Sequence, residues 1–296
     1  METTHPTGWG VRMRDPQAPA QVLAEFRASD PEFITETAIA RVWKVQTAQG
    51  LAALKIYHKP SMGQEADGFV FTDALKGVAV AKVFQTTGNI ALTEWLDGPS
   101  LGDMTRSGED KKAAEILVDV AKTIHSNTHN LGLNLITLEE LFSWLFTIEF
   151  APECPESAQH SIRYCQKLAG ELLASQTDIR PLHGDLHHDN IRLGARGYCA
   201  FDAKGVAGER TFELANAFRN PKAAPKIVQD PARIIMLLEM WSNRFEVNQQ
   251  RLLQWATVKI ALSIAWRCNR RLLHDPELAL LATFIGLPAL WARNKR

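Results

Sequence analysis

The hydrophobic and polar positions change their spacing once along the chain, near Gly98. Before that point, short apolar and β-branched runs alternate with turns, which is typical of strands. Strands are expected over residues 33–45, 51–57, 83–86 and 90–96, with a short helix over residues 64–75. After Gly98, apolar residues recur every three or four positions, which is typical of helices that bury one face.

The helical pattern continues to the end of the sequence. Helices are expected over residues 110–129, 138–148, 157–174, 232–245, 249–273 and 276–292. An irregular insert, residues 181–208, interrupts them and carries the polar residues with the most unusual spacing. The pattern predicts an α+β protein with two lobes. A small β-rich N-terminal lobe would comprise residues 1–97, and a larger, mainly helical C-terminal lobe residues 98–296.

Composition and charge narrow the class of protein. Lysine plus arginine and aspartate plus glutamate both number 33 among the 296 residues, so the formal net charge is zero. This balance argues against a nucleic-acid binder that neutralises phosphates. Residues 1–19 lack the apolar run of a signal peptide, and the apolar stretch 278–291 is too short to span a membrane. Four widely spaced cysteines indicate free thiols. We expect a cytoplasmic protein without a membrane partner, and the oligomeric state stays open.

The strongest chemical signal is the segment LHGDLHHDNI, residues 182–191. Asp185 and Asn190 are separated by four residues, as in the catalytic loop of enzymes that transfer phosphoryl groups. In that loop the aspartate accepts the proton of the attacking hydroxyl, and the asparagine binds a magnesium ion. We therefore predict Asp185 as the catalytic base and Asn190 as a metal ligand.

A second metal ligand is expected at the end of a hairpin. The turn at residues 194–197 would fold the strand at residues 198–201 back against residues 190–193. This pairing would bring Asp202 beside Asn190, where both could share Mg²⁺, a hard cation that prefers oxygen ligands. ATP is the expected phosphoryl donor, because its phosphates bind together with this ion.

Positions upstream are candidates for nucleotide binding. Lys55 lies in an apolar strand, about 130 residues before the catalytic segment, and could hold the α- and β-phosphates. Alternatively, it extends into solvent from a sheet edge. Glu65, on the following helix, could orient Lys55, although Asp67 is close enough in sequence to do so instead. Backbone groups of Glu94 and Leu96 could bond the adenine edge.

The segments HGDLHHDN (183–190), FDAKG (201–205) and FELA (212–215) together resemble the aminoglycoside phosphotransferase family of the kinase-like superfamily. They are similar to the branch that contains streptomycin and hydroxyurea phosphotransferases. The resemblance implies a protein-kinase-like fold, Mg-ATP as donor and a small-molecule hydroxyl as acceptor, such as that of an aminoglycoside-like antibiotic. It also implies supporting roles for His183, His187 and Lys204 around Asp185.

One departure from the kinase pattern lies in the loop expected to cover the phosphates. Residues 35–41, where a glycine-rich loop over the phosphates is expected, contain no glycine. Groups of Thr35, Thr37 and Ala38 would have to take its place. A non-catalytic nucleotide-binding module therefore remains an alternative.

A second alternative comes from the density of histidines in the catalytic segment. His183, Asp185, His187 and His188 form a cluster that could bind the metal of a hydrolase. Such an enzyme would need no ATP. This alternative leaves Lys55 and the predicted hairpin without a role.

The charge of the region between Lys122 and Arg163 indicates which kind of acceptor could bind. It contains no lysine or arginine, but five glutamates: Glu139, Glu140, Glu149, Glu153 and Glu156. Through its electric field, an acidic surface would favour a cationic or polyhydroxyl acceptor. The alternative is a solvated helix face with no contact to substrate.

Overall fold

The computed structural model describes residues 16–129 and 131–294. This part of the chain divides into two compact units. Unit 1 comprises residues 16–61 and 84–95, and unit 2 comprises residues 62–83 and 96–294. Residues 62–83, which the sequence analysis assigns to the N-terminal lobe, thus group with unit 2. No signal peptide is expected in residues 1–19, and most of these residues lie outside the part of the chain that the structure describes.

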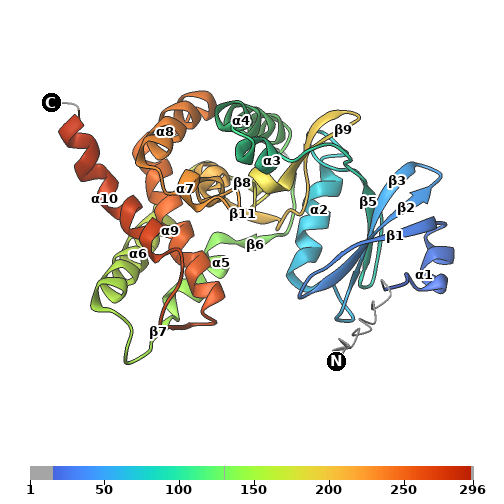
Figure 1. The fold of residues 1–296 in the computed structure, drawn as a ribbon, viewed down its shortest axis with the longest axis horizontal. Coiled ribbons are helices and arrows are strands. Elements are labelled where there is room, and N and C mark those ends of the chain that lie inside the picture. The colour runs from blue at the N-terminus through green and yellow to red at the C-terminus, as the bar shows by residue number, and fades with distance from the viewer. Residues whose placement is uncertain (1–15, 130, 295–296) are drawn as a thin grey trace, which may run out of the picture. The chain divides into compact units, whose positions relative to one another are not determined.

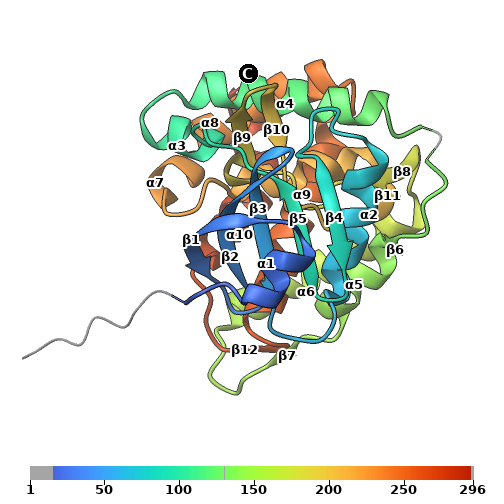
Figure 2. The same cartoon turned by 90° about the vertical axis from the view of Figure 1, so that its right-hand side faces the viewer.

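Unit 1 is built on a five-stranded sheet in the order β1–β2–β3–β5–β4 (Figure 2). The strands are β1 (Ser29–Glu36), β2 (Ala40–Thr47), β3 (Gly50–Tyr57), β4 (Val83–Thr87) and β5 (Ile90–Glu94). Apolar side chains alternate along β2 and β3 and bury one face of the sheet. Helix α1 (Ala20–Glu25), which was not predicted, packs its Val22 and Leu23 against this face.

The turn between β1 and β2 divides the run that the sequence predicts as one strand over residues 33–45. The hydroxyl oxygen of Thr37 accepts hydrogen bonds from the backbone amides of Ile39 and Ala40, at 3.3 and 3.1 Å. A side-chain bond of this kind competes with the ladder bonds of a strand. The prediction of a single strand is therefore wrong at this turn.

Unit 2 is mainly helical (Figure 1). Its longer helices are α2 (Ala66–Ala74), α4 (Asp110–Ser126), α5 (Leu138–Phe146), α6 (Glu156–Ala174), α8 (Pro231–Phe245), α9 (Gln249–Arg267) and α10 (Leu278–Asn294). Shorter ones are η1 (Gly63–Glu65), α3 (Leu101–Arg106), η2 (His188–Asn190), η3 (Arg210–Arg219) and α7 (Pro225–Val228). The predicted helices are confirmed to within a few residues, apart from the end of α9. That helix ends early because Arg271 and Leu272 form strand β12, which pairs with β7 (Glu149–Phe150).

Helix α9 runs through the core of unit 2. Its residues from Leu252 to Ala265 are almost all buried, with no polar face. A helix that is apolar all round is typical of a core element. Among the helices of the described residues, none is long and apolar enough to cross a membrane. The four cysteines are free, as predicted.

Short strands in unit 2 carry the catalytic segment. A three-stranded sheet has the order β6 (Ile136–Thr137), β11 (Val206–Glu209), β8 (Ile179–Leu182). Strands β9 (Ile191–Gly194) and β10 (Gly197–Ala200) form an antiparallel hairpin in which Gly194 pairs with Gly197. The hairpin predicted from the sequence is confirmed.

Candidate active site

A buried carboxylate anchors the loop between β8 and η2, residues 183–187. Glu213 on η3 accepts hydrogen bonds from the backbone amides of His183 and Gly184, at 2.9 and 3.0 Å. The Nε2 atom of His125 on α4 lies 2.9 Å from the same carboxylate. Burial raises the pKa of Glu213, but its hydrogen bonds with His125 and with the backbone amide of His183 outweigh this effect, and the net shift is downward. An ionised carboxylate therefore holds the backbone of the loop.

His183 lies inside the loop that it braces. Its Nε2 atom donates to the carbonyl oxygen of Phe201 at 3.1 Å, and its Nδ1 atom accepts from the amide of Asp185 at 3.3 Å. Burial lowers the pKa of His183, so the ring is neutral and carries its proton on Nε2. Both ring nitrogens are thus engaged in bonds that shape the loop, which favours the predicted supporting role.

The carboxylate of Asp185 is partly exposed, with 26% of its side chain accessible. The Nδ2 atom of Asn216 donates to Oδ1 of Asp185 at 2.9 Å, and Nε2 of His187 lies 4.0 Å from Oδ2. Burial raises the pKa of Asp185, but surrounding positive charge, that of Lys259 first, outweighs this effect and lowers it overall. The carboxylate is therefore ionised at neutral pH, as a proton acceptor must be.

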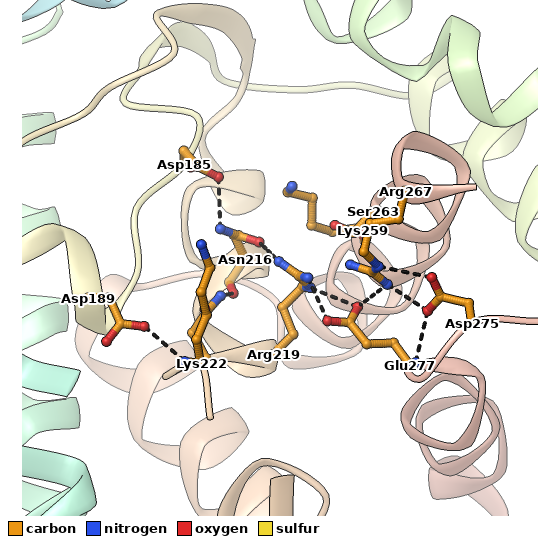
Figure 3. A network of polar contacts seen from close by, with 11 residues as sticks. Asp185, Asp189, Asn216, Arg219, Lys222, Lys259, Ser263, Arg267, Asp275 and Glu277 are labelled. Carbon is orange, nitrogen blue, oxygen red and sulfur yellow. Dashed lines mark hydrogen bonds and ion pairs between the residues drawn. The ribbon is translucent and has the colours of Figure 1, made fainter. Parts of the chain in front are cut away.

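A chain of polar contacts orients the Asn216 amide that bonds Asp185 (Figure 3). Arg219 donates to Oδ1 of Asn216 at 3.2 Å. Since a guanidinium can only donate, this bond forces the amide NH₂ of Asn216 to face Asp185. Glu277 holds Arg219 through both carboxylate oxygens, and Arg267 contacts Glu277 at 2.9 Å. Residues just before α10 thereby orient the amide that contacts the catalytic candidate.

Two residues near Asp185 were not predicted from the sequence: Asn216, described above, and Lys259 on α9. Its side chain is only 1% exposed, and its ammonium lies 4.5 Å from the centre of the Trp266 ring. The ammonium of Lys204 lies 5.4 Å from the centre of the same ring. Burial lowers the pKa of Lys259 to about 7, although the charge of Asp185 opposes this shift. The signal that could have found Lys259 is a lysine within a helix that has no polar face.

The hairpin places Asn190 and Asp202 at its open end. The amide of Phe201 donates to the carbonyl oxygen of Asn190 at 3.0 Å, so Asp202 is one residue beyond this pair. The Nδ2 atom of Asn190 donates to the backbone carbonyl of Asp185 at 3.1 Å. This bond uses the NH₂ group and leaves the side-chain oxygen as the atom that could ligate a metal. An amide and a carboxylate oxygen from adjoining strand ends fit Mg²⁺.

The segment after Asp202 packs closely against α2. A Cβ at Gly68 would lie 1.8 Å from the carbonyl oxygen of Ala203, and a Cβ at Gly205 would lie 2.3 Å from that of Asp67. Both positions require glycine because a Cβ would collide with these oxygens. Gly205 requires it also because its φ is 66°. This close approach explains why residues 62–83 group with unit 2.

His187 and His188 face different surroundings. The Nδ1 atom of His187 accepts from the amide of Asp189 at 3.2 Å, and burial lowers the pKa of His187 to about 4. The ring of His188 is fully buried with its centre 6.2 Å from that of Trp241, and burial lowers its pKa well below the usual value. Within residues 16–129 and 131–294, no three His, Cys, Asp or Glu side chains are grouped to hold a metal. The packing of His188 against Trp241 disfavours the hydrolase alternative.

Asp189 joins the catalytic segment to its neighbours. Its carboxylate accepts from Nη1 of Arg106 on α3 at 2.9 Å and from the backbone amide of Lys222 at 2.9 Å. A Cβ at Gly102 would lie 2.0 Å from Asp189, so α3 can approach only with glycine there. Both carboxylate oxygens of Asp189 thus serve the packing of η2.

Lys55 lies in β3, the central strand of the sheet in unit 1. It is opposite Val42 on one side and Ala91 on the other. Its ammonium is 5.1 Å from the centre of the Tyr57 ring. Because β3 has a neighbour on each side, the alternative of a lysine at a sheet edge is wrong.

The other nucleotide-binding candidates lie in both units. Glu65 is the last residue of η1 in unit 2, and the competing Asp67 accepts from the amide of Ile136 at 3.4 Å. Glu94 ends β5 in unit 1, whereas Leu96 is the first residue of the following segment of unit 2. The pairing of Glu65 with Lys55 and the adenine contacts stay predictions.

A strand-rich unit, a helical unit and a loop with Asp185 and Asn190 five positions apart define a phosphotransferase of the protein-kinase-like class. Residues 27–270 match the family of aminoglycoside/hydroxyurea antibiotic resistance kinases, and the chain belongs to this family. It is 32% identical over 240 residues to streptomycin 3''-kinase from Klebsiella pneumoniae, covering 76% of this chain and 83% of that protein. The protein is therefore a small-molecule kinase, and the predicted family is confirmed.

Solved structures support the same fold. Choline kinase LicA from Streptococcus pneumoniae superposes with a TM-score of 0.63 at 15% identity, over 91% of this chain and 97% of that chain. An amicoumacin kinase in complex with AMP-PNP, Ca²⁺ and Ami superposes with a TM-score of 0.60 at 13% identity, over 88% of each chain. The predicted α+β, kinase-like fold is confirmed.

Proposed function

We propose that this kinase transfers the γ-phosphoryl group of Mg-ATP to a hydroxyl of a polyhydroxyl or cationic small molecule. The observation that carries the proposal is the environment of Asp185. Its ionised, partly exposed carboxylate is fixed by Asn216 and lies on the loop that leads to Asn190. A fixed carboxylate beside oxygen ligands for a metal suits phosphoryl transfer.

In the proposed reaction, Asp185 orients the acceptor hydroxyl and takes its proton. The hydroxyl oxygen forms a bond to the γ-phosphorus, and the bond to the bridging oxygen of ATP breaks, so that the electron pair leaves with ADP. Asn190 and Asp202 would hold Mg²⁺, which neutralises phosphate charge when bound. His183 and His187, both neutral, support the loop without exchanging protons.

The predicted nucleotide contacts are part of the proposal. Lys55 would hold the α- and β-phosphates, with Glu65 as its partner, and backbone groups of Glu94 and Leu96 would bond adenine. The β1–β2 turn would cover the phosphates without glycine. Its amides at Ile39 and Ala40 already bond to the hydroxyl of Thr37, so they contribute less to phosphate binding than a glycine-rich loop would.

The acceptor would approach along the acidic region of unit 2. Two of its five glutamates have local partners: Glu140 caps α5 through the amide of Thr137 at 2.7 Å, and Glu139 accepts from Gln176 at 2.7 Å. The other three, Glu149, Glu153 and Glu156, are exposed. The proposed attraction of a cationic acceptor therefore rests on these three.

The proposal is tested with Asp185→Asn, which keeps the size of the side chain and an oxygen that can accept from Asn216. ADP release would be followed with Mg-ATP and a panel of hydroxylated acceptors, beginning with streptomycin, the substrate that the name of the Klebsiella relative gives. Loss of the base should slow transfer by roughly 10²–10⁴-fold. The affinity for Mg-ATP should stay within about twofold, because Asp185 is not assigned to the nucleotide.

The matched control is Asp119→Asn on the exposed face of α4, which should transfer at the parent rate. Equal rates for Asp185→Asn and the parent would refute the assignment of the base. Binding of Mg-ATP without turnover on any acceptor would instead favour the non-catalytic nucleotide-binding module.

A further inference from the structure

Lys259 is an exception among the buried charges of unit 2. Other buried charged side chains have a direct partner: Arg233 bonds Asp110 at 2.8 Å, and Glu209 is bonded by Arg251. The ammonium of Lys259 has neither an ion pair nor a hydrogen bond with any residue that the structure describes; it lies over the face of the Trp266 ring, 4.5 Å from its centre. Removing a charge from water costs several kcal/mol unless partners compensate. Such an exception calls for an explanation.

The charges that act on Lys259 come from four elements. Asp185 on the catalytic loop is the largest favourable one, and Glu277 before α10 also favours the charged form. Arg219 on η3 and Lys204 after β10 oppose it. The positive charge of Lys259 is in turn the strongest acting on the carboxylate of Asp185, ahead of that of Lys204. Lys259 and Asp185 thus influence each other through their charges, with no hydrogen bond or ion pair between them (Figure 3).

The proposed reaction brings a third charge to this pair. The γ-phosphoryl group must approach the hydroxyl that Asp185 orients, so two negative groups converge at this site. Their repulsion is strong at low dielectric constant. A fixed positive charge nearby offsets it without reorganisation, which is how enzymes stabilise charge that appears only during the reaction.

Building on the proposed function, we propose that Lys259 is a positioning residue whose buried ammonium offsets the repulsion between Asp185 and the incoming phosphoryl group. The proton of the acceptor still goes to Asp185, the new oxygen–phosphorus bond forms at the acceptor, and ADP leaves with the electron pair. Lys259 acts through its charge alone and exchanges no proton. Its burial then reflects a cost in stability that is retained for function.

The test is Lys259→Met, which keeps the apolar stem and removes the charge. Because an uncompensated buried charge is lost, the melting temperature should rise. At pH 6.5, where the ammonium of Lys259 is mainly charged, the turnover number should fall by about tenfold or more, while the KM for Mg-ATP stays within about twofold. A merely structural lysine would instead lose stability and turnover together. A rise in the melting temperature together with a fall in the turnover number would identify Lys259 as a positioning residue.

Two further variants complete the experiment. Lys259→Gln, neutral but polar, should also be slow, which separates loss of charge from loss of polarity. Lys167→Met, on the exposed face of α6, should match the parent in both readouts. Parent-like turnover of Lys259→Met, or a fall in both its melting temperature and its turnover, would overturn this inference and leave the proposed function standing. A parent enzyme that turns over no acceptor at all would refute the proposed function, and this inference with it.

Discussion

Three polar groups converge on the carboxylate of Glu213: the amides of His183 and Gly184 and the ring of His125. The side chains of Glu213 and His125 are 0% and 2% exposed. Glutamine at position 213 would place an NH₂ donor against one of these three donors. We expect Glu213→Gln to lower the free energy of unfolding by about 3 kcal/mol, as when a buried charged interaction is broken.

Urea unfolding of the purified variant measures this change. The control is Glu171→Gln on α6, whose side chain is 62% exposed, and which should change stability by less than about 0.5 kcal/mol. If Glu213→Gln lost less than about 1 kcal/mol, Glu213 would not be the anchor of the catalytic loop.

The lowered pKa of Lys259 leads to a separate prediction about how stability depends on pH. Burial lowers its pKa from 10.5 to about 7, so between these values the unfolded chain holds a proton that the folded chain has released. Stability rises with pH wherever the unfolded state binds more protons. The cost of burying the charge is fully present below about pH 7 and disappears as the pH approaches 10.5. Between pH 7.5 and 9, Lys259 should therefore add roughly 1 kcal/mol of stability per pH unit.

The comparison with Lys259→Met isolates this contribution, because other groups titrate equally in both proteins. Urea unfolding at pH 7.5, 8.2 and 9 should give a steeper rise for the parent than for the variant. Parallel lines for the two proteins would show that Lys259 keeps its ordinary protonation in the folded state.

At the scale of elements, the β9–β10 hairpin decides the proposed metal site. Its register brings Asn190 and Asp202 to one end, and Asp202 has a φ of 56°, which asparagine tolerates better than alanine. Asp202→Asn should therefore keep the hairpin and lose the ligand charge. We expect the affinity for ATP in the presence of Mg²⁺ to fall by about tenfold or more, since a carboxylate is the stronger ligand for this ion.

Calorimetric titration of ATP with MgCl₂ and with EDTA measures the effect. The parent should bind ATP much more tightly with MgCl₂, whereas Asp202→Asn should bind about equally weakly in both. A variant that keeps the full response to Mg²⁺ would remove Asp202 from the metal site.

The elements that the sequence predicts well are those with local signals. The hairpin follows from the turn at residues 194–197, and the helices of unit 2 from apolar spacing. Helix α3 was missed because its six residues are too few to show an apolar period, although Ser100 and Asp103 form a local capping box. The end of α9 was missed because β12 pairs with β7, more than 100 residues away in the sequence.

The residues of the candidate site also fall into two groups, those that the sequence predicts and those that it does not. Asp185, Asn190 and Asp202 lie within one short segment, so their spacing can be recognised in the sequence. Asn216 on η3 bonds Asp185, and Lys259 on α9 acts on it through its charge; only tertiary packing brings these residues near the loop. Their roles follow from burial and hydrogen bonding, neither of which a single sequence contains.

At the scale of the whole molecule, zero net charge means that any attraction of a cationic acceptor must come from where the charges lie. The exposed glutamates Glu149, Glu153 and Glu156 are the candidates, and replacing all three with glutamine should raise the KM of a cationic acceptor such as streptomycin. A rise of about three- to tenfold is expected at low salt, and it should shrink at 0.5 M salt, where the Debye length is only a few ångströms. The matched control carries glutamine at Glu25, Glu32 and Glu239, which are exposed elsewhere and change the net charge equally. If both triple variants raise KM alike, the effect belongs to net charge, and the acidic region has no part in choosing the acceptor.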